Sequence, residues 1–469
     1  MNGDGDPLVY FNGLRRDGSY LQPPLAEEEL VRRLLDAPPD WQLRAEPDPR
    51  GTADPTRAPR YGVDPNRLDR AGWGVVFAAG TDPGVRRALD PLLDLRHEQA
   101  ARLFGETVYR PGESHDDFLA RHRAPRGPAD PTRLPYYLLL VGGPEEIPWS
   151  FQFGLDQVYA VGRLCFERGG DYRAYARSVV DAEERRSRRQ RRVAFFAPEH
   201  AGDRATERTR AQLVAPLADH LEKRFQDHPG WSLERCLGGA AVKRELHRLL
   251  AGPRGPALVF TGGHGLAAGG AGDDDQRRWQ GALITGDWSG EGGIERAHCY
   301  AAADLEADLE TGAGPAGLLA FLFACYSAGT PGSDSYWRQP SAPPRLAARP
   351  FASALAQRLL AHPRGGALAV IGHVDRAWTT SFDWFLDGGQ QSVYEQALEC
   401  LLDGLPAGAA MEYFGQYAAD LAVELCELWT QRDQQGGLAD PAHFARLRLA
   451  HADARSFVVF GDPAARLAV

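Results

Sequence analysis

One histidine and one cysteine in this chain stand where a hydrolytic enzyme would need them. His264 follows an apolar run within residues 257–265, and Cys325 ends a second apolar run within residues 317–329. A cysteine thiol is a strong nucleophile near neutral pH, and a nearby imidazole can take and return its proton. If the two runs are neighbouring strands, both side chains lie at one edge of a sheet and provide the minimum equipment of a cysteine hydrolase.

Glycines flank the histidine on both sides. Gly263 and Gly265 have no side chain to obstruct a peptide substrate, and their backbone N–H groups are free to face a developing oxyanion. The alternatives are a loop histidine in a glycine-rich turn and a buried core cysteine, the usual position of cysteine. Those alternatives weaken because both residues follow predicted strand ends and both are bracketed by small residues.

The elements that must position this pair alternate between strands and helices from residue 136 onward. Runs of five to eight apolar residues bounded by glycines are typical of buried strands in a parallel sheet. We therefore predict an α/β protein, a three-layer α/β/α sandwich with a mostly parallel central sheet. The predicted strands are 136–141, 193–197, the runs before His264 and Cys325, 367–371 and 457–460, and the predicted helices are 171–192, 206–225, 241–250, 351–361, 391–403 and 408–429.

The first 130 residues follow a different pattern. We expect a helix over 26–35, a loop rich in Pro, Asp and Arg over 38–60, a second helical stretch over 85–105 and a linker over 123–131. The sequence therefore predicts that residues 1–130 form an N-terminal extension or accessory domain, and that residues 131–469 form the domain that carries the pair.

Composition limits the classes of function. The net charge of −10 leaves no excess of Lys and Arg for a phosphate-binding surface. No apolar run approaches the roughly 18 residues of a membrane span, and the acidic first residues do not resemble a signal peptide. The six cysteines form no CxxC pair. We therefore expect a cytoplasmic protein that uses no cofactor or metal and binds neither nucleic acid nor membrane.

Six motifs occur in a fixed order along residues 136–469. They are Leu138–Pro148, Asp156–Tyr159 with Val161–Leu164, Phe260–Gly265, Phe323–Gly329, Val370–Trp378 and Val459–Ala464. Together they resemble the caspase-type clan of cysteine peptidases, and within it the gingipain-like branch and the related bacterial CHAT proteases. Gly143 stands where that family usually has Asp. In caspases, too, the histidine precedes the cysteine, by about 50 residues.

The resemblance implies roles for the residues of the pair and their neighbours. Cys325 would be the nucleophile, His264 its proton-transfer partner, and the N–H groups of Gly265 and Cys325 the oxyanion hole. Glu145 or Glu146 could orient His264, because both follow a neighbouring predicted strand. For these two glutamates, a solvated loop position is the alternative that we favour.

The resemblance also implies a substrate preference. In gingipain-like enzymes the Asp of the Asp-Gln-Val-Tyr segment lies at the bottom of a pocket for a basic P1 side chain, so Asp156 would bind Arg or Lys. Trp378 would form an apolar wall against the stem of that side chain. A turn or capping position is the alternative for Asp156. Cleavage after Asp would instead require arginines in the pocket, and Arg376 is the obvious one.

These observations predict a cysteine endopeptidase that acts on proteins or peptides, and the resemblance suggests a regulated protease of bacterial defence or cell death. Residues 330–349, rich in Pro and Ser, are expected to form a mobile loop. Our hypothesis is that a cut there, by the protein itself or by an activating protease or regulator, switches the enzyme on; a simple mobile insertion is the alternative. The competing function is a catalytically silent caspase-like scaffold whose residues 1–130 bind a partner.

Overall fold

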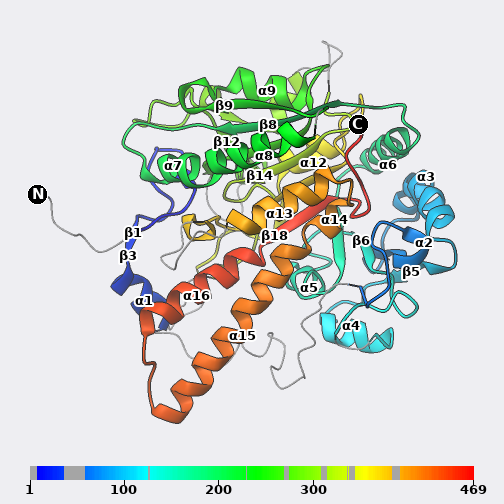
Figure 1. Cartoon of the computed structure of the whole chain (residues 1–469), viewed down its shortest axis with the longest axis horizontal. Helices are drawn as coiled ribbons and strands as arrows, with labels where there is room; N and C mark the ends of the chain where they lie inside the picture. Colours follow the sequence, from blue (N-terminus) through cyan, green and yellow to red (C-terminus); the bar gives the residue numbers. More distant parts are fainter. Residues whose placement is uncertain are drawn as a thin grey trace, which may run out of the picture.

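The central element of the protein is one large twisted sheet. The computed structural model describes residues 8–35, 59–124, 127–228, 230–268, 274–307, 314–334, 336, 344–382 and 391–469. Its 10-stranded sheet has the order β5-β4-β6-β7-β18-β17-β14-β10-β8-β9 (Figure 1). The strands are β4 (Trp73–Phe77), β5 (Phe104–Val108), β6 (Tyr137–Val141), β7 (Ala160–Leu164), β8 (Gln190–Ala197), β9 (Ser232–Leu237), β10 (Pro256–Gly262), β14 (Leu319–Phe323), β17 (Ala369–His373) and β18 (Phe457–Gly461).

The sheet consists of two parallel halves that run in opposite directions. Strands β5, β4, β6, β7 and β18 are parallel to one another, and so are β17, β14, β10, β8 and β9. The halves meet at the antiparallel pair β17·β18, where His373 faces Phe457. The carboxyl ends of the strands in one half therefore lie at the opposite edge of the sheet from those of the other half.

Alternate side chains of the strands enter two hydrophobic cores, one on each face of the sheet. In β10, Leu258 and Phe260 lie in one core and Val259 in the other, as the two-residue period of a strand requires. The predicted α/β/α arrangement with a mostly parallel sheet is thereby confirmed. The Val259 core includes α2 (Leu68–Ala71), α3 (Pro83–Ala100), α4 (His115–Arg121), α5 (Trp149–Leu155), α6 (Gly169–Glu183), α9 (Lys243–Ala251), α11 (Ala302–Ala307) and α12 (Ala354–Leu360); the other includes α1 (Glu27–Leu35), α8 (Ala215–Asp227), α13 (Gln391–Leu402), α14 (Ala407–Ala410), α15 (Glu412–Gln435) and α16 (Pro441–Ala454).

The sheet begins before residue 131, where the sequence placed a domain boundary. Strands β4 and β5 extend it beyond β6, and Trp73 pairs in register with Tyr137. Buried polar contacts fix this region to the end of the chain, because the carboxylate of Asp462 accepts hydrogen bonds from Trp73 (2.9 Å) and Arg96 (2.7 Å). The predicted loop at 38–60 lies almost wholly outside the described residues.

The helix predicted over 171–192 ends at Glu183, and β8 begins at Gln190. Arg185, just after the helix, has a left-handed backbone (φ 61°), and the side chain of Arg189 is directed into the fold. Its guanidinium donates to four backbone carbonyl oxygens, those of Leu250, Pro256, Gly314 and Ala316, at 2.8–3.1 Å. A helix through this position could not make those contacts.

The segment after Cys325 is paired at both of its ends. Strand β15 (Gly329–Thr330) pairs with β16 (Phe351–Ala352), and Ser333 forms a β-bridge with Arg345. The centre of the loop predicted over 330–349, with Arg338, lies outside the described residues. Arg349 forms an ion pair with Glu145 (3.0 Å).

The first described residues run along the edge of the sheet where β10 and β14 end. Strand β1 (Leu8–Val9) pairs with β3 (Leu25–Ala26). Strand β2 (Gly13–Arg15) pairs in parallel with β11 (Gly265–Ala267), in a 4-stranded sheet completed by β12 (Leu283–Ile284) and β13 (Cys299–Tyr300). The N-terminal segment is therefore adjacent to His264.

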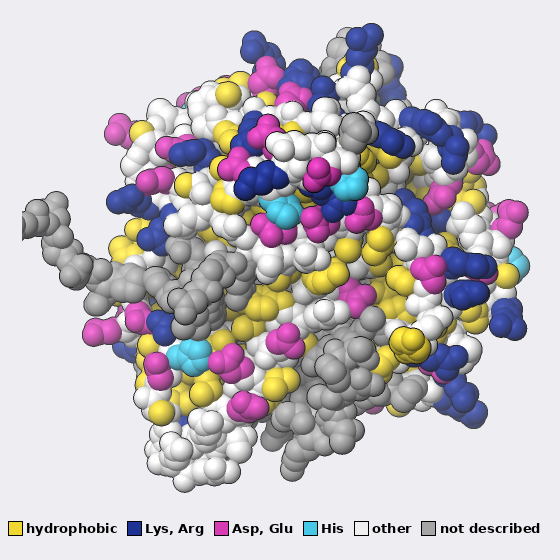
Figure 2. All heavy atoms as spheres, in the orientation of Figure 1, with side chains coloured by type: hydrophobic (Ala, Val, Ile, Leu, Met, Phe, Trp, Pro, Cys, Tyr) yellow, Lys and Arg dark blue, Asp and Glu magenta, His cyan; other side chains and the backbone are white. Residues whose placement is uncertain are grey.

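Charged side chains of both signs are interspersed on the face drawn in Figure 2. The surface carries ion pairs, such as those of Arg235 with Asp219 (2.6 Å) and Glu222 (2.7 Å). Pairs of this exposed kind contribute little stability individually. Within the described residues, every helix is too short or too polar to cross a lipid bilayer.

Candidate active site

His264 and Cys325 are positioned by two adjacent parallel strands. Strands β10 and β14 pair with Gly262 opposite Phe323, and the N–H of Gly263 continues the ladder by donating to the carbonyl of Phe323 (3.1 Å). Both side chains then follow at the same edge, and both are fully buried. Tyr326, next to the cysteine, has a left-handed backbone (φ 59°), so the chain turns sharply after Cys325.

Two backbone N–H groups beside the thiol converge on one oxygen. The N–H of Gly265 and the N–H of Cys325 both donate to the carbonyl oxygen of Asn12, at 3.1 and 3.2 Å. The close approach of the two loops requires glycine at 265, because a Cβ there would lie 1.9 Å from the carbonyl oxygen of Cys325. Paired N–H donors of this kind stabilise the oxyanion of an acyl-transfer reaction.

The imidazole of His264 is held by a carboxylate. Its Nε2 lies 2.6 Å from Oδ2 of Asp203, while its Nδ1 is buried and makes no hydrogen bond within the described residues. Asp203 caps the N-terminus of α7 (Arg204–Arg208) and also accepts from Thr206 (2.8 Å) and from the Tyr20 hydroxyl. Asp203 therefore fixes the ring with Nδ1 as the nitrogen that can exchange a proton.

Burial alone would raise the pKa of Asp203. The charge of His264 and the hydrogen bonds from His264, Tyr20 and Thr206 outweigh that effect, and the pKa of this carboxyl lies below its ordinary range. Asp203 is thus an anion at neutral pH. A negative charge at this position favours the imidazolium that forms when His264 accepts a proton.

Glu145 and Glu146 do not orient His264. Glu145 forms ion pairs with Arg277 (3.3 Å) and Arg349, and Glu146 accepts from the N–H of Gly143 (2.9 Å). Both follow β6, which belongs to the oppositely directed half of the sheet, so they emerge at the other edge. The sequence analysis did not identify Asp203 as the partner of His264. Its position shortly after β8, a predicted strand that pairs with β10, was a signal that could have found it.

The thiol of Cys325 lies in a closed environment. Its Sγ accepts a hydrogen bond from the N–H of Ala377 (3.3 Å), and a Cβ added to Gly13 would lie only 3.1 Å from it. Burial raises the pKa of the Cys325 thiol above its usual range, against the opposing effect of the Ala377 N–H. While the N-terminal segment covers it, the cysteine is therefore held as a neutral thiol.

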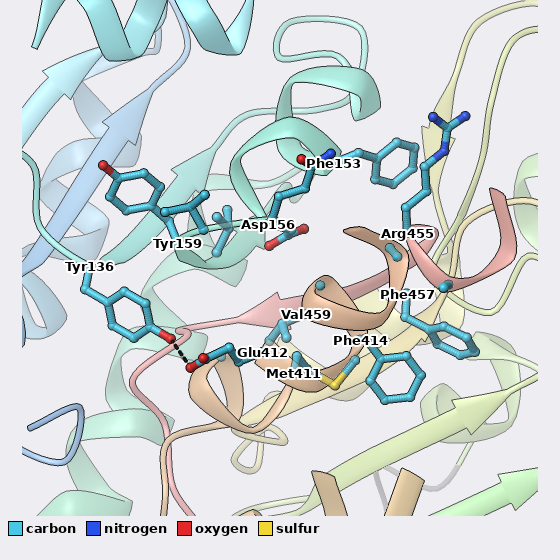
Figure 3. Close-up of a pocket in the computed structure, with 17 residues that line it drawn as sticks. Tyr136, Phe153, Asp156, Tyr159, Met411, Glu412, Phe414, Arg455, Phe457 and Val459 are labelled. Atoms are coloured by element: carbon cyan, nitrogen blue, oxygen red, sulfur yellow. Dashed lines mark hydrogen bonds between the residues drawn. The ribbon is translucent and has the colours of Figure 1, made fainter. Parts of the chain in front are cut away.

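Asp156 does not lie beside the pair. It lines a separate cavity with Tyr136, Met411 and Phe414, and neither His264 nor Cys325 is among the described residues of its wall (Figure 3). Burial raises the pKa of Asp156 well above its ordinary value. Asp156 precedes β7, and strands β18 and β17 separate β7 from β14.

Trp378, in contrast, lies near the cysteine. It follows Ala377, whose N–H contacts the thiol, and its ring packs on those of Phe11 (centroids 5.0 Å apart) and Tyr336 (5.4 Å). Arg376 is occupied by buried ion pairs with Asp334 and with Asp375 (3.2 Å). Trp378 therefore packs against aromatic side chains of the protein itself, and its role as a wall of a substrate pocket stays a prediction.

Comparison of this chain with models of known protein families and with curated proteins finds no match. Among solved structures the chain is similar to the Arg-specific cysteine proteinase gingipain R (RGPB), with 12% identity, 85% of this chain and 78% of that chain covered, and a TM-score of 0.46. It is similar to a structure described as a protease (13% identity, 85% and 78% covered, TM-score 0.48) and to the pro- and mature domains of Porphyromonas gingivalis RgpB (10%, 84% and 80%, 0.46).

Proposed function

We propose that this protein is a cysteine endopeptidase. The observation that carries the proposal is the convergence of the Gly265 and Cys325 N–H groups on a single carbonyl oxygen directly beside the Cys325 thiol. The bond from Gly265 also belongs to the β2·β11 ladder, and the bond from Cys325 adds a second donor to the same oxygen. The buried His264, with Asp203 behind it, supplies the proton transfer that this chemistry requires.

Each group has a defined part in the reaction. Nδ1 of His264 takes the thiol proton, and the thiolate attacks the carbonyl carbon of the substrate. The two N–H groups stabilise the oxyanion, and His264 then gives its proton to the leaving amine. Water hydrolyses the resulting thioester. Asp203 keeps the ring oriented and stabilises the imidazolium, so it is a positioning residue.

The decisive experiment combines covalent labelling with hydrolysis. A peptide carrying a thiol-reactive electrophile should label Cys325, mapped by mass spectrometry, in preference to the chain's other cysteines. Hydrolysis of a peptide library should disappear in Cys325→Ala and His264→Ala. Equal labelling of all accessible cysteines together with no hydrolysis of any peptide would favour the silent scaffold.

The position of Asp156 does not support a preference for a basic P1 residue. That preference depended on Asp156 at the base of a pocket next to the pair, and Asp156 lines a different cavity. The acidic residues closer to the thiol, Asp334 and Asp375, are already paired with Arg376.

A further inference from the structure

The segment Tyr10–Gly13 joins β1 to β2 and passes over the residues that follow β10 and β14, with a bridge at Phe11 and a bend at Asn12. The N–H of Asn12 donates to the carbonyl of Ala377 (2.9 Å), and the N–H of Thr379 donates to the carbonyl of Tyr10 (3.0 Å). Phe11 forms the antiparallel bridge with Trp378 that lies between these two bonds. Backbone pairing of this kind is how extended peptides bind in a groove.

The register of the segment places one peptide bond at the nucleophile. The carbonyl oxygen that accepts from Gly265 and Cys325 belongs to Asn12, and the next residue, Gly13, lies against the Cys325 Sγ. The bond presented to the thiol is therefore Asn12–Gly13. The absence of a side chain at residue 13 leaves the approach to it open, since a Cβ there would lie 3.1 Å from the sulfur.

The side chain of Asn12 has its own recognition contact. Asn12 is fully buried, and its Nδ2 donates to Oγ1 of Thr209 at 2.9 Å. Thr209 begins the π-helical turn Thr209–Val214, directly after the short helix that Asp203 caps, and its hydroxyl also bonds to the carbonyl of Ala205 (2.8 Å). The pocket is thus built for a short side chain with a hydrogen-bonding amide.

Residues after Gly13 are anchored independently of those before it. Gly13 pairs with Gly265 and accepts from the N–H of Leu21 (3.0 Å), and the hydroxyl of Tyr20 contacts Asp203. A cut after Asn12 would leave this anchored part in place and would free the strand that fills the groove.

We propose, on the basis of the proposed function, that the protein cleaves its own Asn12–Gly13 bond and that its site prefers asparagine at P1. The Cys325 thiolate attacks the carbonyl carbon of Asn12, the C–N bond to Gly13 breaks, and His264 donates the thiol proton to the new amine. Water then hydrolyses the Asn12 thioester, which releases residues 1–12 with a terminal carboxylate and regenerates the thiol. Atoms balance with water as the co-reactant.

The test uses the full-length protein and follows intact mass over time at neutral pH. We expect wild type to lose residues 1–12 and to gain Gly13 as its N-terminus, at a rate independent of protein concentration, while Cys325→Ala stays whole. Asn12→Arg and Asn12→Gln should slow the cut by at least about tenfold. Thr209→Val, which keeps the shape of the side chain and removes its hydroxyl, should slow it by a similar factor.

Asn2→Gln is the matched control, because residue 2 begins the same Asn-Gly dipeptide as residue 12. This variant should process like wild type. Cleavage of Cys325→Ala at Asn12, which would show spontaneous Asn-Gly chemistry, or faster cleavage of Asn12→Arg, would overturn the proposal.

A second arm separates the two proposals. Peptides spanning residues 8–17 with Asn, Arg or Asp at position 12 are offered to the wild-type protein after incubation. Cys325-dependent hydrolysis of the Arg or Asp peptide in preference to the Asn peptide, with residues 1–12 retained, would refute the asparagine proposal and leave the peptidase standing. No hydrolysis of any peptide and no self-cleavage would refute both.

Discussion

Asp203 and His264 form a buried contact of 2.6 Å between a helix-capping carboxylate and the imidazole that follows β10. The contact joins the loop after β8 to the loop after β10, so the pairing of two parallel strands sets its geometry. Because Nε2 faces the carboxylate, the role of proton carrier is left to Nδ1.

Asp203→Asn should lower peptide hydrolysis by about 10²–10⁴-fold with the fold retained, since an amide can hold the ring but cannot stabilise the imidazolium. Glu145→Gln is the matched control and should stay within about twofold of wild type, because Glu145 pairs with arginines away from His264. Steady-state rates on a peptide substrate decide the matter. A larger loss in Glu145→Gln than in Asp203→Asn would contradict this assignment.

The same residue predicts a dependence of stability on pH. An acid whose pKa is lowered on folding contributes stability that is present above its ordinary pKa of 3.8 and is lost as the pH falls below it. Asp203→Asn should therefore unfold more easily than wild type at pH 7, and the gap should narrow below that value. Urea unfolding at several pH values measures this, and a gap that widens in acid would refute it.

Cys325→Ala should reduce turnover of peptides by at least about 10³-fold, because the reaction loses its covalent step. Cys236→Ala, at a buried thiol in edge strand β9, is the matched control and should leave turnover unchanged. Hydrolysis and melting temperature are measured on the same samples. Turnover in the alanine variant at the wild-type level would exclude Cys325 as the nucleophile.

Asp156→Asn should leave the P1 preference of any peptide hydrolysis unchanged, because neither His264 nor Cys325 is among the described residues that line the Asp156 cavity. It should also stabilise the protein at pH 7. Burial raises the pKa of Asp156, and an acid with a raised pKa destabilises the fold increasingly as the pH rises above its ordinary 3.8. Cleavage-site mapping tests the first statement, and thermal unfolding at pH 4 and pH 8 tests the second. A changed P1 preference in Asp156→Asn would show that Asp156 does take part in binding the P1 side chain.

His200 should make the protein sensitive to mild acid. Burial and the nearby charge of His264 lower the pKa of His200 from 6.5 to about 4, so the folded state binds fewer protons than the unfolded state between these values. Stability then falls as the pH drops through this window, by up to about 1.4 kcal/mol per pH unit from this group. In His200→Gln, the free energy of unfolding should depend less steeply on pH between pH 6.5 and 4. A slope equal to that of wild type would show that another group causes the acid sensitivity.

The strand ends that carry the pair could be predicted from the sequence, because β10 and β14 are continuous apolar runs closed by glycine or a small residue. Such runs identify parallel strands without knowledge of their partners. The direction of each strand in the sheet could not be predicted in this way. Glu145, which follows β6, was therefore a plausible partner of His264 in the sequence. In the fold it lies at the edge of the sheet opposite to the one that carries His264.

Asn12 and Asp203 show a second limit of sequence reasoning. The group of Asn12 that meets Gly265 and Cys325 is a backbone carbonyl, and any residue type supplies one, so no pattern marks that contact before the fold is known. Asp203 and Thr209 belong to short turns of helix whose positions depend on β8 and β10 being neighbours. The error over Asp156 arose because a four-residue motif says nothing about how many strands separate it from the nucleophile.

The position of β18 at the centre of the sheet has a consequence for how the protein becomes active as it is made. This strand is synthesised after every other strand of the sheet, yet it is the one that joins β7 to β17. Asp462, immediately beyond it, completes the buried contacts to Trp73 and Arg96. Contacts this distant in sequence form slowly. A ribosome-bound chain that already contains His264 and Cys325 therefore still has two unjoined half-sheets, whereas the N-terminal segment that covers Cys325 was made first and has long been available to dock.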